Sequence, residues 1–138
     1  MVGKLVQIRR EERGASLVEL ALVLFLLVLL VVGIADVGRA FNSYMVIVNA
    51  SREGARYASR FPHDNGGITG AVRAEAANSS VPPGDIGIVV DNLGGKSGQE
   101  ISVTATYDFP TLFGSILGTT TIPMNNTTRM VIFGVEPD

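Results

Sequence analysis

Few side chains in this sequence have the type and spacing that catalysis or metal binding requires. The chain has no cysteine and one histidine, His63, which lies beside Asp64 in a glycine-rich stretch. A catalytic triad or a metal site needs several such groups from different segments, so we expect this pair to lie in a solvated loop. The Gly-Lys-Ser run at 95–97 lacks the earlier glycine of a phosphate-binding loop, because position 90 is valine. The sequence therefore predicts no enzyme, no metal site and no cofactor.

The size and charge of the chain limit the number of domains it can hold and the partners it can bind. With 138 residues it can hold one ordinary domain, or a small domain and an appendage. Its formal net charge is −2, whereas a nucleic-acid-binding domain presents a clustered basic face. We therefore expect no nucleic-acid partner.

A long apolar run begins directly after one acid, Glu19. Residues 20–35 read LALVLFLLVLLVVGIA and hold no charge. Extended back to Ala15, the segment is long enough to cross a bilayer core, which takes roughly 20 helical residues. A buried helix of a soluble protein is the alternative, but so short a chain could hardly surround one. The sequence therefore predicts a single membrane-spanning helix over 15–35.

The charges on either side of this helix predict its orientation. Residues 1–14 carry four basic and two acidic residues, a net charge of +2, and the rest carries seven basic and eleven acidic residues, a net charge of −4. Basic flanks tend to remain on the cytoplasmic side of a membrane. We therefore expect the N-terminus in the cytoplasm and the C-terminal part outside the cytoplasmic membrane.

The junction between the basic leader and the helix is the most specific feature of the sequence. The leader ends in Gly14, Ala15 follows, and Glu19 is the fifth residue counted from Ala15. This arrangement resembles the processing site of type IV pilin-like precursors, in which a prepilin peptidase cuts after a glycine and the fifth residue of the processed chain is usually glutamate. The resemblance implies a cleaved leader over 1–14 and a processing site at Gly14 and Ala15.

A role for Glu19 follows from the new N-terminus. Cleavage would leave a free α-amino group on Ala15, with a reference pKa of about 8. Four residues of helix rise about 6 Å, so Glu19 would lie just inside the hydrocarbon, where a carboxylate needs a partner. In staggered subunits Glu19 can neutralise the Ala15 ammonium of a neighbour, which makes it an assembly and helix-packing residue. Alternatively, its side chain reaches the headgroups without any partner.

Two rival interpretations place the N-terminus elsewhere. Gly33 and Ala35 precede Asp36 with the spacing of a signal-peptidase site, and cleavage there would release a secreted soluble domain. If no cleavage takes place, the chain is a single-pass, membrane-anchored extracytoplasmic binding module that is not polymerised.

Further motifs narrow the resemblance to one family. Together with the junction, residues 36–41 (DVGRAF) and 50–58 (ASREGARYA) look like the TadE-like family of bacterial pseudopilins or minor pilins of the Tad (Flp) pilus and related secretion systems. The resemblance is close from residue 9 to about 60. It implies assembly with other pilin-like subunits and the pilus assembly platform. Leu20 stands where major Flp pilins usually have tyrosine, and those pilins are far shorter, so a minor or accessory subunit is favoured.

The membrane helix is expected to continue over 36–60, because no proline occurs before Pro62. Large apolar residues recur here at helical spacing and form one stripe, which we expect to pack against the domain that follows. The residues of this apolar stripe are Ile34, Val37, Phe41, Tyr44, Met45 and Val48.

Charged residues of the same segment allow two kinds of ion pair. Spacings of three residues permit pairs within the helix, from Asp36 to Arg39 and from Glu53 to Arg56. Arg52, Arg56 and Arg60 follow one another at helical spacing and form a basic ridge. Residues 61–138 carry three basic and eight acidic residues, a net charge of −5, so the ridge of one subunit could pair with the acidic surface of a neighbouring subunit. The candidates for ion pairs between subunits are Asp36, Arg39, Arg52, Arg56 and Arg60.

Residues 61–138 are expected to form a small extracytoplasmic domain, which makes the fold class α+β. Apolar alternation and glycine-rich turns predict an antiparallel sheet of three or four strands, with one face packed on the long helix and on a short helix. The expected elements are a helix over 68–78, strands over 86–91 and 99–109 joined by a hairpin loop at 92–98, a helical turn or loop over 111–117, and one interrupted strand or two over 119–122 and 128–135.

Overall fold

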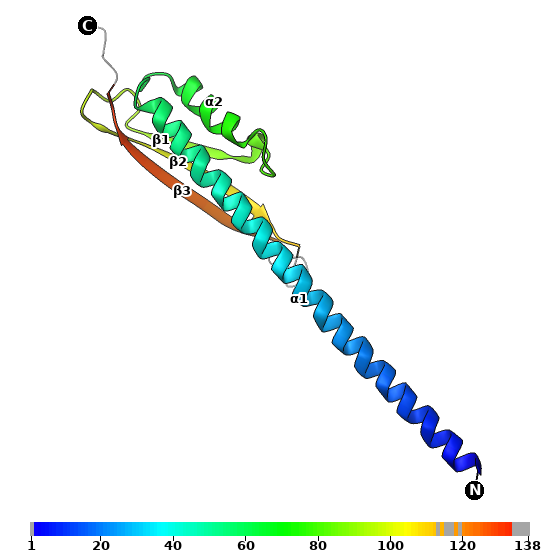
Figure 1. Cartoon of the computed structure of the whole chain (residues 1–138). Coiled ribbons are helices and arrows are strands. Elements are labelled where there is room, and N and C mark those ends of the chain that lie inside the picture. Colours follow the sequence, from blue (N-terminus) through cyan, green and yellow to red (C-terminus); the bar gives the residue numbers. More distant parts are fainter. Residues whose placement is uncertain (1, 113, 115–117, 119, 134–138) are drawn as a thin grey trace.

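The computed structural model describes residues 2–112, 114, 118 and 120–133, with side chains from residue 14 onward. In chain order its elements are α1 (Val2–Ala58), α2 (Asn65–Ala76), the short 3-10 helix η1 (Pro83–Asp85), β1 (Gly87–Asp91), β2 (Glu100–Pro110) and β3 (Thr121–Val131). This arrangement confirms the expected α+β class (Figure 1). Most of the expected turn at 111–117, and the end of the last expected strand at Val135, lie outside the described residues.

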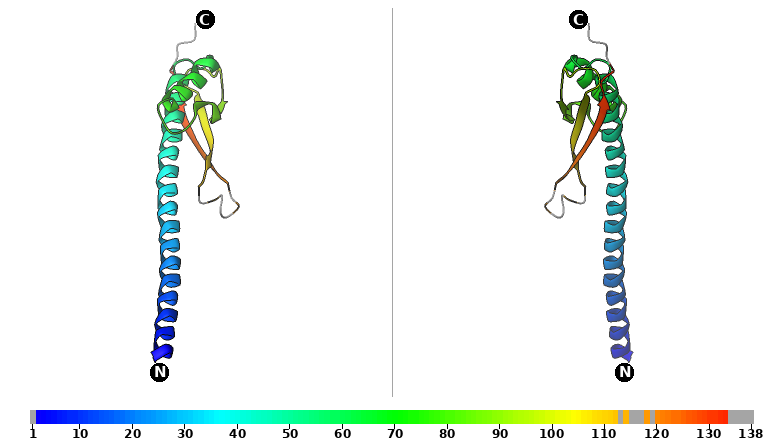
Figure 2. Two further views of the ribbon diagram at one scale, coloured as in Figure 1. Left: turned by 90° about the vertical axis from the view of Figure 1, so that its right-hand side faces the viewer. Right: turned by 90° about the vertical axis from the view of Figure 1, so that its left-hand side faces the viewer.

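The long helix α1 dominates the shape of the molecule. Its 57 residues run without a break, which corresponds to a rod of about 85 Å. The far end of this rod carries the N-terminus and stands clear of the folded part (Figures 1 and 2). The prediction that the apolar helix continues unbroken to about residue 60 is therefore confirmed, with its end at Ala58.

A three-stranded antiparallel sheet lies beside the end of α1, in the order β1-β2-β3. The central strand β2 buries its alternate apolar side chains, as the sequence pattern predicts. The last strand is continuous through Pro123, which pairs with Asp108 of β2. The expected interruption is therefore wrong. Proline is tolerated here because β3 is an edge strand and needs no donor on its outer side.

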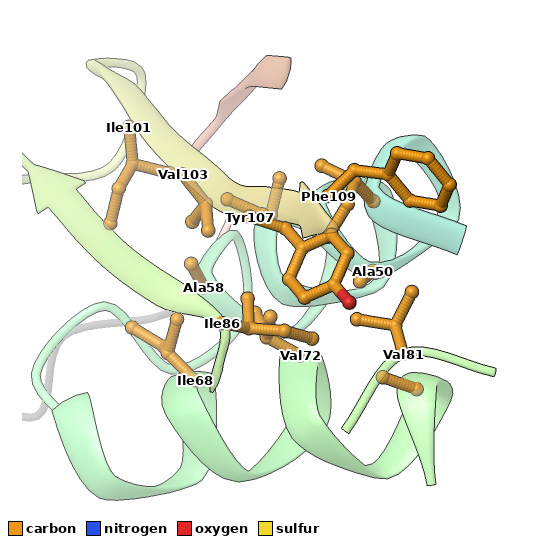
Figure 3. Packing of buried hydrophobic residues seen from close by; sticks show 14 of the residues in the cluster. Ala50, Ala58, Ile68, Val72, Val81, Ile86, Ile101, Val103, Tyr107 and Phe109 are labelled. Atoms are coloured by element: carbon orange, nitrogen blue, oxygen red, sulfur yellow. The ribbon is translucent and has the colours of Figure 1, made fainter. Parts of the chain in front are cut away.

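The sheet and α2 pack on the same short stretch of α1 and meet each other there. Ile68 and Val72 of α2 point towards Val103 and Tyr107 of β2, with Ala58 of α1 between them (Figure 3). All these side chains are buried. The core is thus formed by one end of α1, one face of α2 and the inner face of β2.

The face of α1 that packs on the domain differs from the predicted one. Ile34, Val37 and Phe41 of the apolar stripe are 65–71% exposed, and within this stripe only Val48 is buried. The buried face consists mainly of small residues, and the expectation that the stripe would pack there is wrong. Small side chains let the sheet and α2 approach the helix closely, whereas the large ones would hold them away. The buried residues of this face are Ser43, Ile47, Ala50, Ser51, Gly54, Ala55 and Ala58.

α2 begins at Asn65, three residues before the expected start at Ile68, and Asp64 sets this start. The Asp64 carboxylate accepts a hydrogen bond from the Gly67 N–H at 2.8 Å and another from the Tyr57 hydroxyl at 2.8 Å. Asp64 is therefore the N-cap of α2 and ties it to the end of α1. Both hydrogen bonds, that of Gly67 first, hold the pKa of the Asp64 carboxyl below its usual value.

Replacing Asp64 by asparagine is expected to reduce the loss of folding stability that the protein shows as the pH falls into the acid range. The unfolded chain binds the Asp64 proton more tightly than the folded chain, so this carboxylate stabilises the fold above its unfolded pKa of about 3.9. The contribution is lost as the pH falls below that value and through the lower folded pKa. Asparagine can still cap the helix but does not titrate. Thermal unfolding of both proteins between neutral and acid pH measures the difference, and identical losses of stability in acid would contradict this role.

Candidate functional site

The residues of the expected processing site lie on the free part of α1. Gly14, Ala15 and Glu19 are all helical, and their surfaces are exposed. Within the described part of the chain, Glu19 makes no hydrogen bond and no ion pair. Its carboxylate is thus available to a group outside the described part of the molecule.

The apolar segment around Glu19 is long enough to cross a membrane. The helix from Gly14 to Ala58 contains a window with a mean hydropathy of 3.1, and none of that window is buried. Large apolar side chains of a water-soluble helix are normally covered by other parts of the protein. An exposed helix of this length and composition suggests membrane anchoring.

The charged residues beyond the apolar segment pair within α1. Arg39 Nη1 donates to Asp36 Oδ1 at 2.8 Å, and Arg56 Nε donates to Glu53 Oε2 at 2.8 Å. Both pairs have the i, i+3 spacing seen in the sequence. The hydrogen bond from Arg56 lowers the pKa of Glu53, and the more distant charge of Arg60 acts in the same direction.

The basic ridge of α1 faces outward. Arg52, Arg56 and Arg60 are exposed, and neither Arg52 nor Arg60 forms an ion pair with any described residue. Arg56 shares its charge with Glu53, as described above. The sequence-predicted candidates therefore divide into two intrahelical pairs and two arginines that are open to a partner.

A half-buried polar cluster around the buried Ser51, which sequence analysis did not identify, ties β3 to α1. Ser51 Oγ donates to the Val48 carbonyl at 2.9 Å and accepts from Asn126 Nδ2 at 2.6 Å. Thr128 Oγ1 lies 2.9 Å from the same Ser51 oxygen. Ser51 is 75 positions from Asn126 and 77 from Thr128 in the sequence, so no local pattern could have joined them. The cluster stabilises the packing of β3 on α1.

The structure also places the His63–Asp64 pair and the Gly-Lys-Ser run, for which the sequence predicted no catalytic or phosphate-binding role. Asp64 caps α2, and the ring of His63 lies beside Gly94 of the β1–β2 loop. The Gly-Lys-Ser run at 95–97 lies in that loop and is followed by β2 rather than by a helix. Among the described residues, no group of three or more histidines or acids could hold a metal ion.

Fold and site together define a class of protein: a small α+β domain carried on one long, apolar and exposed helix. The comparison with known families identifies the helix more closely. Residues 14–56 match the family model of TadE-like proteins, which confirms the resemblance. The whole match lies within α1, and it suggests a Tad pilus-associated protein of a family of structural proteins not known as enzymes. No curated protein and no solved structure matches the chain.

Proposed function

We propose that this chain is a pilin-like subunit, a pseudopilin or minor pilin, of a Tad-type pilus or a related secretion system. A prepilin peptidase would cut it between Gly14 and Ala15. The observation that carries this proposal is the start of the TadE-like match at Gly14, five residues before an exposed acid without a described partner. An acid at this depth of a membrane segment is costly and calls for a function.

The proposed mechanism is lateral packing of apolar helices. Cleavage frees the amine of Ala15, and the Glu19 carboxylate of a neighbouring subunit neutralises it. A pair of opposite charges within an apolar surround has one favourable register, so it sets the stagger between subunits. The exposed apolar surface of α1 supports this mechanism, because it remains available for helix contacts. The chain itself performs no reaction and is a substrate of the peptidase.

The proposed topology divides the chain into four parts. Residues 1–14 form a cleaved cytoplasmic leader, 15–35 cross the cytoplasmic membrane, and 36–60 extend the helix beyond it. Residues 61–138 belong to the extracytoplasmic domain, which the fibre would carry outward. Its partners are the peptidase, other pilin-like subunits and the assembly platform. Arg52 and Arg60 are available for acidic surfaces of those subunits.

Replacing Gly14 by leucine is expected to leave the precursor at full length. The peptidase requires the small residue before the cut, so the wild-type chain should lose fourteen residues and the variant none. Electrophoresis of membrane fractions from cells with and without a co-expressed prepilin peptidase measures the shortening.

Gly33→Leu is the matched control, because a Cβ at either glycine meets no other atom within 4 Å. It disrupts the small-residue pattern that signal peptidase needs before Asp36, and it leaves the Gly14 junction intact. We expect normal shortening of this control. Shortening of Gly14→Leu together with a full-length Gly33→Leu would reject the proposed site in favour of cleavage after Ala35.

A further inference from the structure

The adjoining ends of β2 and β3, at Phe109 and Ile122, line a groove with the apolar part of α1. β2 runs from the folded end of the molecule towards the free part of the helix, β3 returns antiparallel to it, and the pair diverges from the helix (Figure 2). Between hairpin and helix is an open groove of about 770 Å³. Apolar side chains predominate in its lining. On the helix side they include Leu26, Leu29, Leu30 and Ile34, and on the hairpin side Phe109 and Ile122.

The charges of α1 fix the depth of this groove in a bilayer. Between Arg13 and Asp36 the helix has 22 residues, of which only Glu19 is charged. At 1.5 Å per residue they span about 33 Å, close to the hydrocarbon thickness of about 30 Å. Leu26 and Leu30 belong to this stretch. The part of the helix wall from Leu26 to Ile34 therefore lies in the hydrocarbon whenever α1 crosses the membrane, while Asp36 marks its upper limit.

The hairpin wall has the character of a surface in contact with lipid. Leu112 is 56% exposed and Ile122 is 44% exposed. The sequence from Phe109 to Thr128 contains no charged residue, and its polar residues are threonine, serine and asparagine. Two exposed aliphatic side chains at the end of an uncharged hairpin favour an apolar environment.

Among the residues described at this end, three backbone nitrogens need no hydrogen bond to water. The Thr111 N–H donates to the Thr120 carbonyl at 3.0 Å, which extends the hydrogen-bonded ladder beyond the ends of the strands. Pro110 and Pro123 flank the end and have no N–H group that would need a partner. In hydrocarbon, unpaired backbone donors are costly, so these features lower the cost of immersion.

Charged residues of the helix and of the hairpin lie at the same level, which we take as the boundary between lipid and water. The Arg39 guanidinium lies 5.2 Å from the centre of the Phe109 ring and pairs with Asp36. Asp108, the last charged residue of β2, is the immediate neighbour of Phe109. Arginine and aromatic rings are favoured at membrane interfaces, where a charge reaches water above an apolar body. Below this level neither wall of the groove carries a charge among its described residues.

We propose that the adjoining ends of β2 and β3, at Phe109 and Ile122, lie in the bilayer leaflet nearest the folded domain, and that phospholipid acyl chains fill the groove between them and α1. The hairpin is then a second membrane contact, which holds the domain at one height and one rotation about the helix. This inference requires α1 to cross the bilayer. It does not require cleavage after Gly14 or assembly into a fibre.

The absence of native cysteine allows a direct test by single labelling. The full-length Leu112→Cys variant carries an environment-sensitive nitrobenzoxadiazole label in vesicles of phosphatidylethanolamine and phosphatidylglycerol. Leu93→Cys is the control, because Leu93 is also exposed and lies in the loop at the other end of the sheet. Since ions are excluded from hydrocarbon, iodide on both sides of the bilayer should quench the Leu112 label about tenfold less than the Leu93 label. Spin-labelled acyl chains should quench the Leu112 label and spare the other.

Two outcomes would overturn the proposal. Equal iodide quenching at Leu112 and Leu93 would place the hairpin end in water. Iodide protection of Leu112 that disappears on dilution of protein into excess lipid would mean that a second copy covers the groove. Unchanged thermal unfolding of each labelled variant confirms that the fold is retained. Either failure would leave the proposed processing and assembly untouched, because the measurement uses the unprocessed chain.

Discussion

A Glu19→Leu variant is expected to be processed and inserted like the wild-type chain but to be lost from the fibre. Leucine favours insertion more than an acid does, so the membrane fraction should contain normal amounts of the shortened protein. In the assembled state, however, the ammonium of Ala15 in the neighbouring subunit would have no counter-charge in an apolar surround. Removing one member of such a pair is strongly destabilising, and incorporation should fall by about tenfold or more. Immunoblots of sheared fibres against the membrane fraction measure the ratio.

Ser16→Leu is the matched control for this experiment. Ser16 lies three residues before Glu19 on the same exposed part of α1 and is likewise polar. Its replacement changes the apolar surface but removes no charge, so the variant should be incorporated as the wild type is. Undiminished incorporation of Glu19→Leu would contradict the pairing of Glu19 with a neighbouring N-terminus.

A Gly54→Leu variant is expected to unfold the extracytoplasmic domain at a much lower temperature. A Cβ at Gly54 would lie 2.4 Å from Val72 Cγ2 and 3.1 Å from Val103 Cγ1, which places this glycine at the junction of α1, α2 and β2. Both valines are branched at Cβ and cannot turn aside easily. Overpacking costs about 1–3 kcal/mol for smaller insertions, so a whole leucine should lower the melting temperature by about 10 °C or more.

The control for this second experiment is Gly38→Leu. A Cβ at Gly38 meets no atom within 4 Å, so the substitution adds the same side chain to the same helix without a clash. Near-ultraviolet circular dichroism of the purified chains in detergent follows the packing of Tyr107 and the other tyrosines during heating. A Gly54→Leu variant that melts with the wild type would show that α1, α2 and β2 do not pack as described.

Several elements could be predicted from sequence because their signals are local. The apolar run of α1, the alternation along β2 and the spacing of the two intrahelical ion pairs each lie within a short stretch of chain. The processing site at Gly14 and Ala15 and the role of Glu19 rest on position and identity alone, since the processing pattern is a short local motif, and they stay predictions. The structure adds the exposure of these residues.

Other features depend on contacts that a local pattern does not contain. The large residues of the apolar stripe predicted the wrong packing face, because close approach of a sheet and a helix selects small residues such as Ala50 and Gly54. Glycines at 66 and 67 read as a loop, although the Asp64 cap places them in the first turn of α2. The polar cluster at Ser51 and the groove beside Leu30 join segments far apart in the chain, so only the folded arrangement reveals them.

The identity of the first residue of the mature chain tests the central claim most directly. The protein should be purified from the membranes of cells that carry a prepilin peptidase, and its N-terminal sequence and intact mass determined. The account predicts that the chain begins at Ala15. A chain that still begins at Met1, or one that begins at Asp36, would contradict it.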